Sequence, residues 1–530
     1  MTFLRPASRR SPFKGTLLKK ARQVISLSFL LLYFLLFTGF LNGMTAIKEV
    51  LRTAQIFPAA LKIIGGDFAA VLGLGLILIL TLLFGRFYCS SLCPLGTLQD
   101  LFIISSRKIF NRKDYRFHKE WNLFRYCILA FSVIMLVSGS LILINLIEPF
   151  SNFGRLTANL IRPPAAMFFN TMSLILLQFH IYFSSDIPIH SLEASVLILT
   201  ISFFFGLFIL SWLRGRLYCN TFCPTGALLS LFSRFSLWKL GFREEECTGC
   251  ALCESVCKAE CINSGERQLD SSRCIHCYNC LDACPRHALE FQFRLIGGKK
   301  RNVDKRRREF LSLFIKGSIA AIILHFTSNV SRANAIMPFL PVKRKYPVIP
   351  PGSESIAHFT AYCTGCHLCA ISCPTHVIKP TLIQFGLAGL FQPVMDYDSS
   401  FCNYECNACL KVCPTGAIKE YSLEEKKIIQ IGFANLDKKK CIAYVQNKQC
   451  GICAEYCPTS AVYLVPYKKN LPAPVTDSEI CIGCGACENA CPARPEKAIT
   501  VEGNPVHKRV AKREGKPPVN MKQESRDFPF

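Results

Sequence analysis

Runs of four closely spaced cysteines constrain the fold of this chain more than any other feature of its sequence. Thirty of the 530 residues are cysteine, and most of them fall into six such runs. Four runs have the spacing C-x2-C-x2-C-x3-C, and in the other two the first gap widens to three and to eight residues. Thiolates at this spacing are typical ligands of a [4Fe–4S] cluster. The runs are Cys247, Cys250, Cys253 and Cys257; Cys274, Cys277, Cys280 and Cys284; Cys363, Cys366, Cys369 and Cys373; Cys402, Cys406, Cys409 and Cys413; Cys441, Cys450, Cys453 and Cys457; and Cys481, Cys484, Cys487 and Cys491.

The first two runs have the arrangement of a two-cluster ferredoxin, in which the last cysteine of each run binds the cluster of the other. Zinc is the main rival for paired C-x2-C elements, but the third cysteine and a trailing Cys-Pro favour iron–sulfur chemistry. In one departure from the pattern, Lys258 rather than proline follows Cys257, and Cys261 is an alternative ligand in place of Cys257. The expected ligand sets are Cys247, Cys250, Cys253 and Cys284 for one cluster, and Cys274, Cys277, Cys280 and Cys257 for the other.

The remaining four runs predict four more clusters, so that the chain would hold six [4Fe–4S] clusters. We expect fourth ligands to be exchanged between partner runs here too, with the outer two runs paired together and the inner two paired together. Residues 363–367 (CTGCH) also match the C-x-x-C-H pattern of covalent haem attachment. Both of these cysteines already belong to a complete cluster run, so covalent haem is not expected.

Four stretches without any charged side chain are long enough to cross a bilayer, which takes about 20 residues. They are residues 24–41, 68–85, 126–147 and 194–213. Lys and Arg number seven before the first span, three in the first loop, eight in the second and two in the third. Because basic loops stay in the cytoplasm, this alternation predicts a cytoplasmic N-terminus. Residues 166–183 are also apolar but are interrupted by polar side chains, and we interpret them as a helix on the outer membrane surface.

A second cysteine pattern occurs twice in the membrane half. The sequence GRFYCSSLCPLG at 85–96 recurs as GRLYCNTFCPTG at 215–226, each time directly after a predicted span. Such a repeat indicates a duplicated two-helix unit whose copies meet at the cytoplasmic ends of their spans. Four soft ligands would then be available to an extra metal or cluster centre, with redox dithiols and inert buried cysteines as the alternatives. These ligands are Cys89, Cys93, Cys219 and Cys223.

The segment between the two cysteine-rich regions combines a basic run with a mildly apolar stretch. Residues 299–308 contain seven Lys and Arg, residues 307–311 fit the twin-arginine pattern R-R-x-F-L, and Ala333-Asn334-Ala335 resembles a cleavage site. A fifth span here would carry everything after about residue 337 to the outside of the membrane. An ordinary basic linker followed by a short amphipathic helix is the alternative.

These features predict an α-helical integral membrane domain, with four spans and a fifth near residue 310, joined to α+β domains of the bacterial ferredoxin type. The net charge of +26 needs no nucleic-acid partner. Six clusters at about −2 each offset about half of it, and basic runs beside apolar segments hold much of the rest. The expected order is a basic cytoplasmic tail (1–23), a membrane domain (24–240), a two-cluster domain (241–296), a basic linker with the fifth span (297–336), a four-cluster domain (337–502) and a basic disordered tail (503–530).

The motifs together resemble a known electron-transfer system. Residues 20–290, with two G-R-x-Y-C-x3-C-P motifs and then a two-cluster ferredoxin, resemble the membrane quinol-dehydrogenase subunit of the periplasmic nitrate reductase system (NapH-type). Residues 300–500 resemble that system's twin-arginine-exported four-cluster ferredoxin (NapG-type), as if the two were fused.

The resemblance implies a multi-pass protein of the bacterial inner membrane that takes electrons from the quinone pool. It would deliver them to a periplasmic reductase or c-type cytochrome, with the two-cluster domain in the cytoplasm and the four-cluster domain in the periplasm. The alternative is a maturation factor that reduces or loads a metal through the C-x3-C-P motifs. A membrane core of about 30 Å is too wide for one electron hop. Electron transfer across it therefore needs a quinone, or a centre on the motif cysteines, between the inner and outer clusters.

Overall fold

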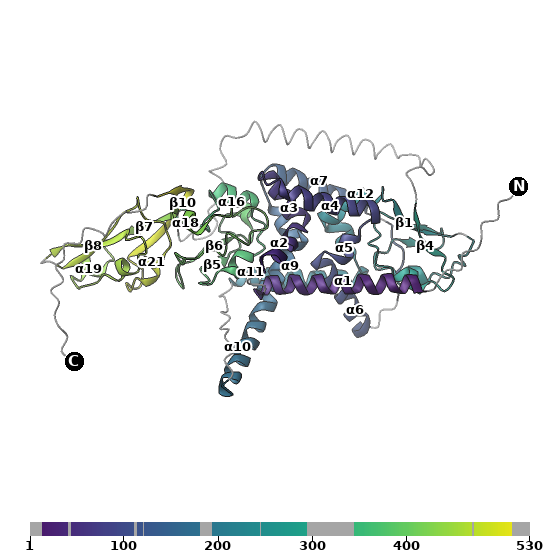
Figure 1. The fold of residues 1–530 in the computed structure, drawn as a ribbon, viewed down its shortest axis with the longest axis horizontal. Coiled ribbons are helices and arrows are strands. Elements are labelled where there is room, and N and C mark those ends of the chain that lie inside the picture. Colours follow the sequence, from purple (N-terminus) through teal and green to yellow (C-terminus); the bar gives the residue numbers. More distant parts are fainter. Residues whose placement is uncertain are drawn as a thin grey trace.

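The computed structural model of the chain describes residues 13–40, 44–110, 114–119, 121–180, 193–243, 245–293, 344–468 and 471–510. Figure 1 shows an elongated molecule in which a bundle of helices lies between two small domains of loops and hairpins. The helices come from the first 233 residues, and the small domains follow in sequence. The predicted basic linker with its twin-arginine-like fifth span (297–336) lies outside the described residues, so it stays a prediction.

All four predicted spans are helical. They correspond to α1 (Phe13–Thr38), α4 (Ala69–Phe84), α7 (Asn122–Val137) and α11 (Ala194–Arg214). By length and composition, α1, α11 and the continuous helix from Pro149 to Gln178 could cross a membrane, whereas α4 and α7 are shorter apolar helices. The third span was predicted too long, because α7 ends just before Gly139, which has a φ of +73°. A separate helix, α8 (Ile142–Ile147), follows.

The helix predicted at 166–183 begins earlier than expected. It consists of α9 (Pro149–Leu156), the π-helical turn η1 (Thr157–Ile161) and α10 (Arg162–Gln178). The Glu148 carboxylate caps its first turn by accepting hydrogen bonds from the backbone N–H groups of residues 150 and 151. The last part, α10, projects away from the bundle (Figure 1), with large apolar side chains exposed. Its place at the membrane surface stays a prediction.

The first helix starts inside the segment predicted as a basic tail. Residues 13–23 of the predicted tail are helical, and basic side chains of this part of α1 find acidic partners far along the sequence. Lys19 Nζ lies 2.6 Å from a carboxylate oxygen of Asp282, and Arg22 Nη1 lies 3.1 Å from one of Asp100. These partners let a charged first half of α1 fold as a helix.

Shorter helices complete the bundle and reveal its internal repeat. In each copy a long helix ends in a motif, and a second helix leads away from it. The second helix of the first copy, α6, packs on α11, and the second helix of the other copy, α12, packs on α4. This reciprocal packing is the arrangement expected of a duplicated two-helix unit. The shorter helices are α2 (Thr45–Thr53), α3 (Ile56–Ile64), α5 (Phe87–Ser91), α6 (Pro94–Phe110), η2 (Tyr218–Phe222) and α12 (Pro224–Ser233).

The two-cluster domain is closed by an antiparallel pair of strands at its two ends. Strand β1 (Trp238–Phe242) pairs with β4 (Leu289–Phe293), with Leu240 opposite Phe291. Between these strands lie α13 (Leu252–Ser255), β2 (Ile262–Asn263), β3 (Gln268–Leu269) and α14 (Asn279–Ala283).

The four-cluster domain consists of two consecutive units. The first contains α16 (Ile356–Tyr362), α17 (Leu368–Ser372), β5 (Ile378–Pro380), η4 (Leu387–Gly389), β6 (Pro393–Met395) and α18 (Leu423–Lys427). The second contains β7 (Ile429–Leu436), α19 (Ile442–Val445), α20 (Ile452–Glu455), β8 (Val462–Pro466), β9 (Pro472–Thr476), α21 (Ala486–Ala490) and β10 (Ile499–Arg509). The disordered tail was predicted to start too early, at 503, because β10 continues to pair with β7 as far as Arg509.

The two cysteine-rich domains lie at opposite ends of α1 (Figure 1). At its start, a Cβ on Gly15 would lie 3.3 Å from Leu281 of the two-cluster domain. Just beyond its end, a Cβ on Gly39 would lie 3.6 Å from Ile371 of the four-cluster domain. The 26 residues of α1 correspond to roughly 39 Å of helix, which exceeds the hydrocarbon core of about 30 Å.

Candidate iron–sulfur sites

The eight cysteines of the first two runs form two groups of four neighbouring thiols. Each group contains three cysteines of one run and the last cysteine of the other. Burial raises the pKa of the Cys253 thiol to about 12, and the charges of Cys284, Cys247 and Cys250 raise it too. Burial likewise raises the pKa of the Cys280 thiol, as do the charges of Cys277, Cys274 and Cys257. Thiols that repel one another in this way ionise together only when a cationic centre binds them. The groups are Cys247, Cys250, Cys253 and Cys284, and Cys257, Cys274, Cys277 and Cys280, as the spacing predicts.

The fifth cysteine of this region, Cys261, lies beside the second group. Its side chain is buried, and its Sγ is 3.6 Å from Sγ of Cys257. It also interacts with the Cys274 thiol by a hydrogen bond. Cys257 keeps its place in the group, and Cys261 is positioned to donate its single S–H to the sulfur of either Cys257 or Cys274.

The four runs of the C-terminal domain pair with their neighbours in sequence. Burial raises the pKa of the Cys369 thiol, and the charges of Cys363, Cys366 and Cys413 raise it further. Burial and neighbouring thiols likewise raise the pKa of Cys409, Cys453 and Cys487. The groups are Cys363, Cys366, Cys369 and Cys413; Cys402, Cys406, Cys409 and Cys373; Cys441, Cys450, Cys453 and Cys491; and Cys481, Cys484, Cys487 and Cys457.

The predicted pairing of outer with outer and inner with inner runs is therefore wrong. It would have placed Cys373 with the last run, Cys413 with the run that begins at 441, Cys457 with the run that begins at 402, and Cys491 with the run that begins at 363. In the structure, Cys373 lies instead beside the thiols of the second run, where it and Cys406 both act electrostatically on Cys402.

The second unit corrects the other two assignments in the same way. Cys491 acts electrostatically on Cys453, in the run just before its own, and Cys457 acts on Cys487, in the run just after its own. Consecutive runs close a shorter loop, which costs less chain entropy than joining the first run to the last. The two units meet where the backbone N–H of Cys402 donates to the carbonyl oxygen of Cys484, at 2.9 Å.

Local contacts hold the individual ligand cysteines of these runs in place. Three runs end in Cys-Pro-Thr, and the threonine hydroxyl lies close to the sulfur in each of them. The Sγ–Oγ1 distance is 3.5 Å from Cys373 to Thr375, 3.6 Å from Cys413 to Thr415 and 3.7 Å from Cys457 to Thr459.

The fourth run lacks this threonine, and the second run has a contact of its own at the cysteine after its widened gap. Cys491 is followed by Pro-Ala, so no hydroxyl is available at that position, and the Cys491 side chain is 7% exposed. Cys406, after the widened gap of its run, is half-buried, and its Sγ accepts the backbone N–H of Ala408 at 3.5 Å. Both remain members of their thiol groups.

The two C-x3-C-P motifs meet in the bundle around a local two-fold arrangement. Arg86 Nη2 lies 3.7 Å from Sγ of Cys89 and donates to the carbonyl oxygen of Cys219 at 3.1 Å. Arg216 Nη1 lies 3.8 Å from Sγ of Cys219 and donates to the carbonyl oxygen of Cys89 at 3.0 Å. Each arginine therefore binds its own copy's sulfur and the other copy's backbone.

All four motif cysteines belong to this group. The thiols of Cys219, Cys89 and Cys223 lie close enough to Cys93 to act on it electrostatically. All four side chains are buried, each at most 5% exposed. Among the described residues, no three His, Cys, Asp or Glu side chains are spaced for a single metal ion, either here or in the six cluster runs. A cubane cluster holds its cysteine sulfurs further apart, since each binds a different iron.

The charges around the motif thiols fit an anionic centre. Arg86 and Arg216 are both fully buried. Arg216 is neutralised in part by Asp100, at 2.9 Å. Within the described part of the chain, Arg86 has no carboxylate partner and bonds instead to the Asn220 side chain, two backbone carbonyls and a thiol. A buried unpaired cation is costly, and a cluster with four thiolates, whose net charge is about −2, would compensate it.

The glycines of the motif have steric roles that explain their place in the repeat. Gly85 and Gly215 end their helices with φ of +72° and +59°, a region that favours glycine. A Cβ on Gly96 would lie 2.3 Å from the carbonyl oxygen of Cys89, and one on Gly226 would lie 2.2 Å from that of Cys219. The repeat therefore encodes a tight backbone arrangement around the thiols.

The motif is joined directly to the second thiol group of the two-cluster domain. Arg86 Nη1 donates to the carbonyl oxygen of Ser272 at 3.1 Å, two residues before a ligand cysteine. The Asn220 side chain donates to the carbonyl oxygen of Ala259 at 3.2 Å, and the backbone N–H of Arg216 donates to that of Lys258 at 2.9 Å.

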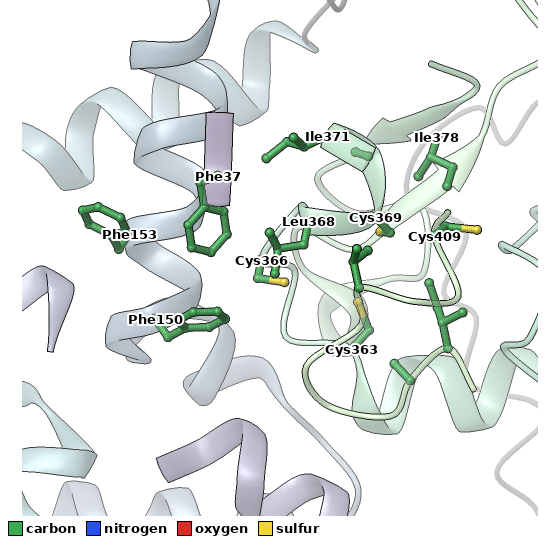
Figure 2. Packing of buried hydrophobic residues seen from close by; sticks show 14 of the residues in the cluster. Phe37, Phe150, Phe153, Cys363, Cys366, Leu368, Cys369, Ile371, Ile378 and Cys409 are labelled. Carbon is green, nitrogen blue, oxygen red and sulfur yellow. The ribbon is translucent and has the colours of Figure 1, made fainter. Parts of the chain in front are cut away.

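At the other end of the bundle, the first thiol group of the four-cluster domain rests on α9 and α1. Ser151 Oγ and Thr364 Oγ1 are 2.8 Å apart. Figure 2 shows Phe37 and Phe150 on the side of the helices that faces the loop with Cys366 and Leu368. The C-terminal domain therefore packs directly against the helices.

Sequence reasoning identified the motif cysteines but missed the polar residues that surround them. The guanidinium groups of Arg86 and Arg216 and the side chain of Gln99, which lies 3.4 Å from Sγ of Cys219, were given no role. The signal was present for the arginines, since both repeats contain Gly-Arg at the same position. Gln99 lies outside the identical positions and left no such signal.

Comparison with known proteins shows which family the chain resembles. A 4Fe-4S binding domain family model matches residues 67–113 and 196–243, which contain the two motifs. A 4Fe-4S dicluster domain model matches residues 362–417 and 440–494, the two consecutive units, and another dicluster model matches 270–377. The ferredoxin-type protein NapF of Escherichia coli is 30% identical over 153 residues, 29% of this chain and 83% of NapF. The chain belongs to the Nap-type 4Fe-4S ferredoxin family.

Other relatives of this Nap-type ferredoxin match longer stretches of the chain. The ferredoxin-type protein NapG of Escherichia coli is 28% identical over 199 residues, which is 35% of this chain and 80% of NapG. An uncharacterized protein of Methanocaldococcus jannaschii is 28% identical over 219 residues, 40% of this chain and 67% of that protein. No solved structure matches the chain at a significant level.

Proposed function

We propose that this protein carries electrons from the quinol pool of a membrane to a redox partner on its four-cluster domain, a periplasmic reductase or c-type cytochrome. The observation that carries the proposal is the linear order of the thiol groups. Two groups lie at one end of α1, the motif group lies next to them in the bundle, and four lie at the other end. Iron–sulfur clusters, when bound, accept and release single electrons.

The motif thiols hold the centre that connects the two domains. Their neighbours reach toward both ends of the molecule. On one side, Arg86 contacts the two-cluster domain at Ser272. On the other side, Tyr218 donates from its hydroxyl to the carbonyl oxygen of Ile147 at 2.6 Å, next to the start of α9. A centre here divides a distance of about 30 Å or more into shorter steps, which supports electron transfer across the membrane.

The burial of the motif argues against the maturation alternative. A factor that reduces or loads a metal needs its thiols within reach of a partner. The four motif cysteines are each at most 5% exposed: Cys89, Cys93, Cys219 and Cys223. Closed sites of this kind suit a resident cofactor better than an exchanging one.

The sidedness belongs to the same proposal. The loops predicted to lie inside contact the two-cluster domain, as when the backbone N–H of Phe117 donates to Glu254 at 2.8 Å. The loops predicted to lie outside contact the four-cluster domain, as where Ser151 Oγ lies 2.8 Å from Thr364 Oγ1. The inferred cytoplasmic and periplasmic positions follow from the basic loops.

Quinol-driven reduction of the purified protein tests the function. We expect menadiol to bleach the visible iron–sulfur absorbance of anaerobically purified protein in a stopped-flow mixer. Dithionite marks the full extent of reduction, and iron analysis should give about 28 Fe per chain for seven cubane clusters. Protein whose clusters dithionite reduces but no quinol reduces would contradict the proposal.

Protease added to intact spheroplasts tests the sidedness. The four-cluster domain of the wild type should be digested, while a variant with Arg307→Lys and Arg308→Lys should protect it, because charge is kept and twin-arginine recognition is lost. Protection of the wild-type domain would instead put it in the cytoplasm.

A further inference from the structure

A cleft of about 450 Å³ opens between the helical bundle and the four-cluster domain. Its bundle side is formed by α2, α3 and the turn that follows α3, and its other side by α16 and the loop around Gly416. This volume lies in the usual range for sites that bind small organic molecules. Cys413, a member of the first thiol group of the four-cluster domain, lines the cleft.

Large, exposed apolar side chains border the mouth of the cleft. The lining turn Gly65-Gly66-Asp67 is flanked by Ile64 and Phe68, which are 56% and 76% exposed. One turn further, Leu72 is 80% exposed. In a helix bundle that crosses a membrane, apolar side chains this exposed face the hydrocarbon. A molecule in the bilayer could therefore reach the cleft without passing through water.

The interior of the cleft is polar and carries groups that bind and deprotonate a hydroxyl. Lys62 Nζ lies 3.8 Å from Glu49 and 3.4 Å from Asp67. His358 Nδ1 donates to the carbonyl oxygen of Ser353 at 3.0 Å, which leaves Nε2 as the ring nitrogen able to accept a proton. Burial lowers the pKa of His358, so the ring is neutral at pH 7.

We infer that this cleft is the site where a membrane hydroquinone is bound and oxidised. The inference rests on the proposed function and adds the place of the reaction. The mouth admits an apolar tail, the volume fits a ring, and Lys62 and Glu49 bind its oxygens. His358, which lines the same cleft as Cys413, accepts a proton from the ring.

The reaction balances with these groups. A hydroquinone becomes a quinone when both O–H bonds break and two electrons leave the ring. One proton goes to His358 Nε2, and the other goes through the Glu49 carboxylate to solvent. The two electrons would leave singly for clusters held by the Cys413 group and by the next thiol group along the domain, and each cluster would take up one electron.

Two measurements on the full-length protein test the site. The first is binding of the quinol analogue 2-heptyl-4-hydroxyquinoline N-oxide, followed by quenching of its fluorescence. The second is the rate at which menadiol reduces the protein. We expect Lys62→Met and Glu49→Gln to weaken binding of the analogue at least tenfold. His358→Gln should slow reduction by menadiol at least tenfold while changing binding of the analogue less than threefold.

Matched controls come from the opposite end of the molecule. His287→Gln changes an exposed histidine of the two-cluster domain, and Lys108→Met changes an exposed lysine of α6. Both should bind the analogue and react with menadiol as the wild type does. Iron content and full reduction by dithionite verify that every variant is folded and contains its clusters. If Lys62→Met is unstable, Glu49→Gln, the most conservative change, is used to test binding.

The outcomes separate this inference from the function on which it rests. Cleft variants that bind the analogue and react with menadiol like the wild type would overturn the cleft as the site, while the function stands. A wild type that neither binds the analogue nor reacts with any quinol would overturn both. Binding of the analogue that is lost equally in the two control variants would also contradict the assignment.

Discussion

The two buried arginines of the motif make the electrostatic potential at the neighbouring thiols more positive. Arg86→Gln removes a cation that has no carboxylate partner within the described residues. At an effective dielectric of about 20 and a separation of about 7 Å, Coulomb's law gives about 2 kcal/mol, or roughly 100 mV for one electron. We expect the potential of the motif centre to fall by this order in a redox titration followed by EPR.

Two comparisons make that result specific. Arg86→Lys keeps the charge and should retain most of the potential. Arg243→Gln removes a guanidinium that pairs with Glu290 at 2.7 Å on the two-cluster domain, away from the motif, and should leave the motif centre unchanged. Equal potentials in Arg86→Gln and the wild type would show that the arginine has no electrostatic role there.

A second prediction at this scale concerns Cys261. Its thiol lies 3.6 Å from Sγ of Cys257 and is placed as a hydrogen-bond donor. Hydrogen bonds to ligand sulfurs raise cluster potentials, because they stabilise the more negative reduced state. Cys261→Ala should therefore lower the potential of this one centre by roughly 40 mV, which corresponds to about 1 kcal/mol. Loss of the cluster's iron in this variant would instead identify Cys261 as a ligand.

At the scale of elements, the C-terminal end of α1 packs against α9, and the four-cluster domain contacts α9 in turn. The ring of Phe37 is fully buried, with its centroid 5.2 Å from that of Phe150 and 6.0 Å from that of Phe153. Phe37→Ala should cost about 3–5 kcal/mol and lower the midpoint of thermal unfolding. Leu27→Ala, on the same helix but 51% exposed, is the matched control and should change the midpoint little. Equal midpoints in the two variants would contradict this packing role.

The helices and thiol groups were predictable to different degrees. Hydropathy located the long apolar helices, because a long uncharged stretch has few other stable forms. Ligand exchange between the first two runs followed from their spacing. The places of Cys373, Cys457 and Cys491 did not, because the spacings of the last four runs are compatible with several partners. The helical start of α1 depends on Asp282 and Asp100, which come from distant segments, so local sequence could not reveal it.

At the scale of the whole molecule, the central claim is that electrons exchanged between the two cysteine-rich domains cross the membrane through the motif thiols. The two cysteine-rich domains are held at opposite ends of a helix of roughly 39 Å, and the motif group is the thiol group placed in the bundle between them. Any electron that passes from one domain to the other must therefore use this group or a mobile carrier.

The most direct test uses proteoliposomes free of quinone, with ferricyanide trapped inside and dithionite added outside. In the wild type we expect the absorbance of the trapped ferricyanide to fall as electrons cross. In a variant with Cys89→Ser and Cys219→Ser it should stay constant, although dithionite still reduces the clusters on its own side. Trapped ferricyanide that stays oxidised in wild-type vesicles, or that is reduced equally fast in the variant, would contradict the account.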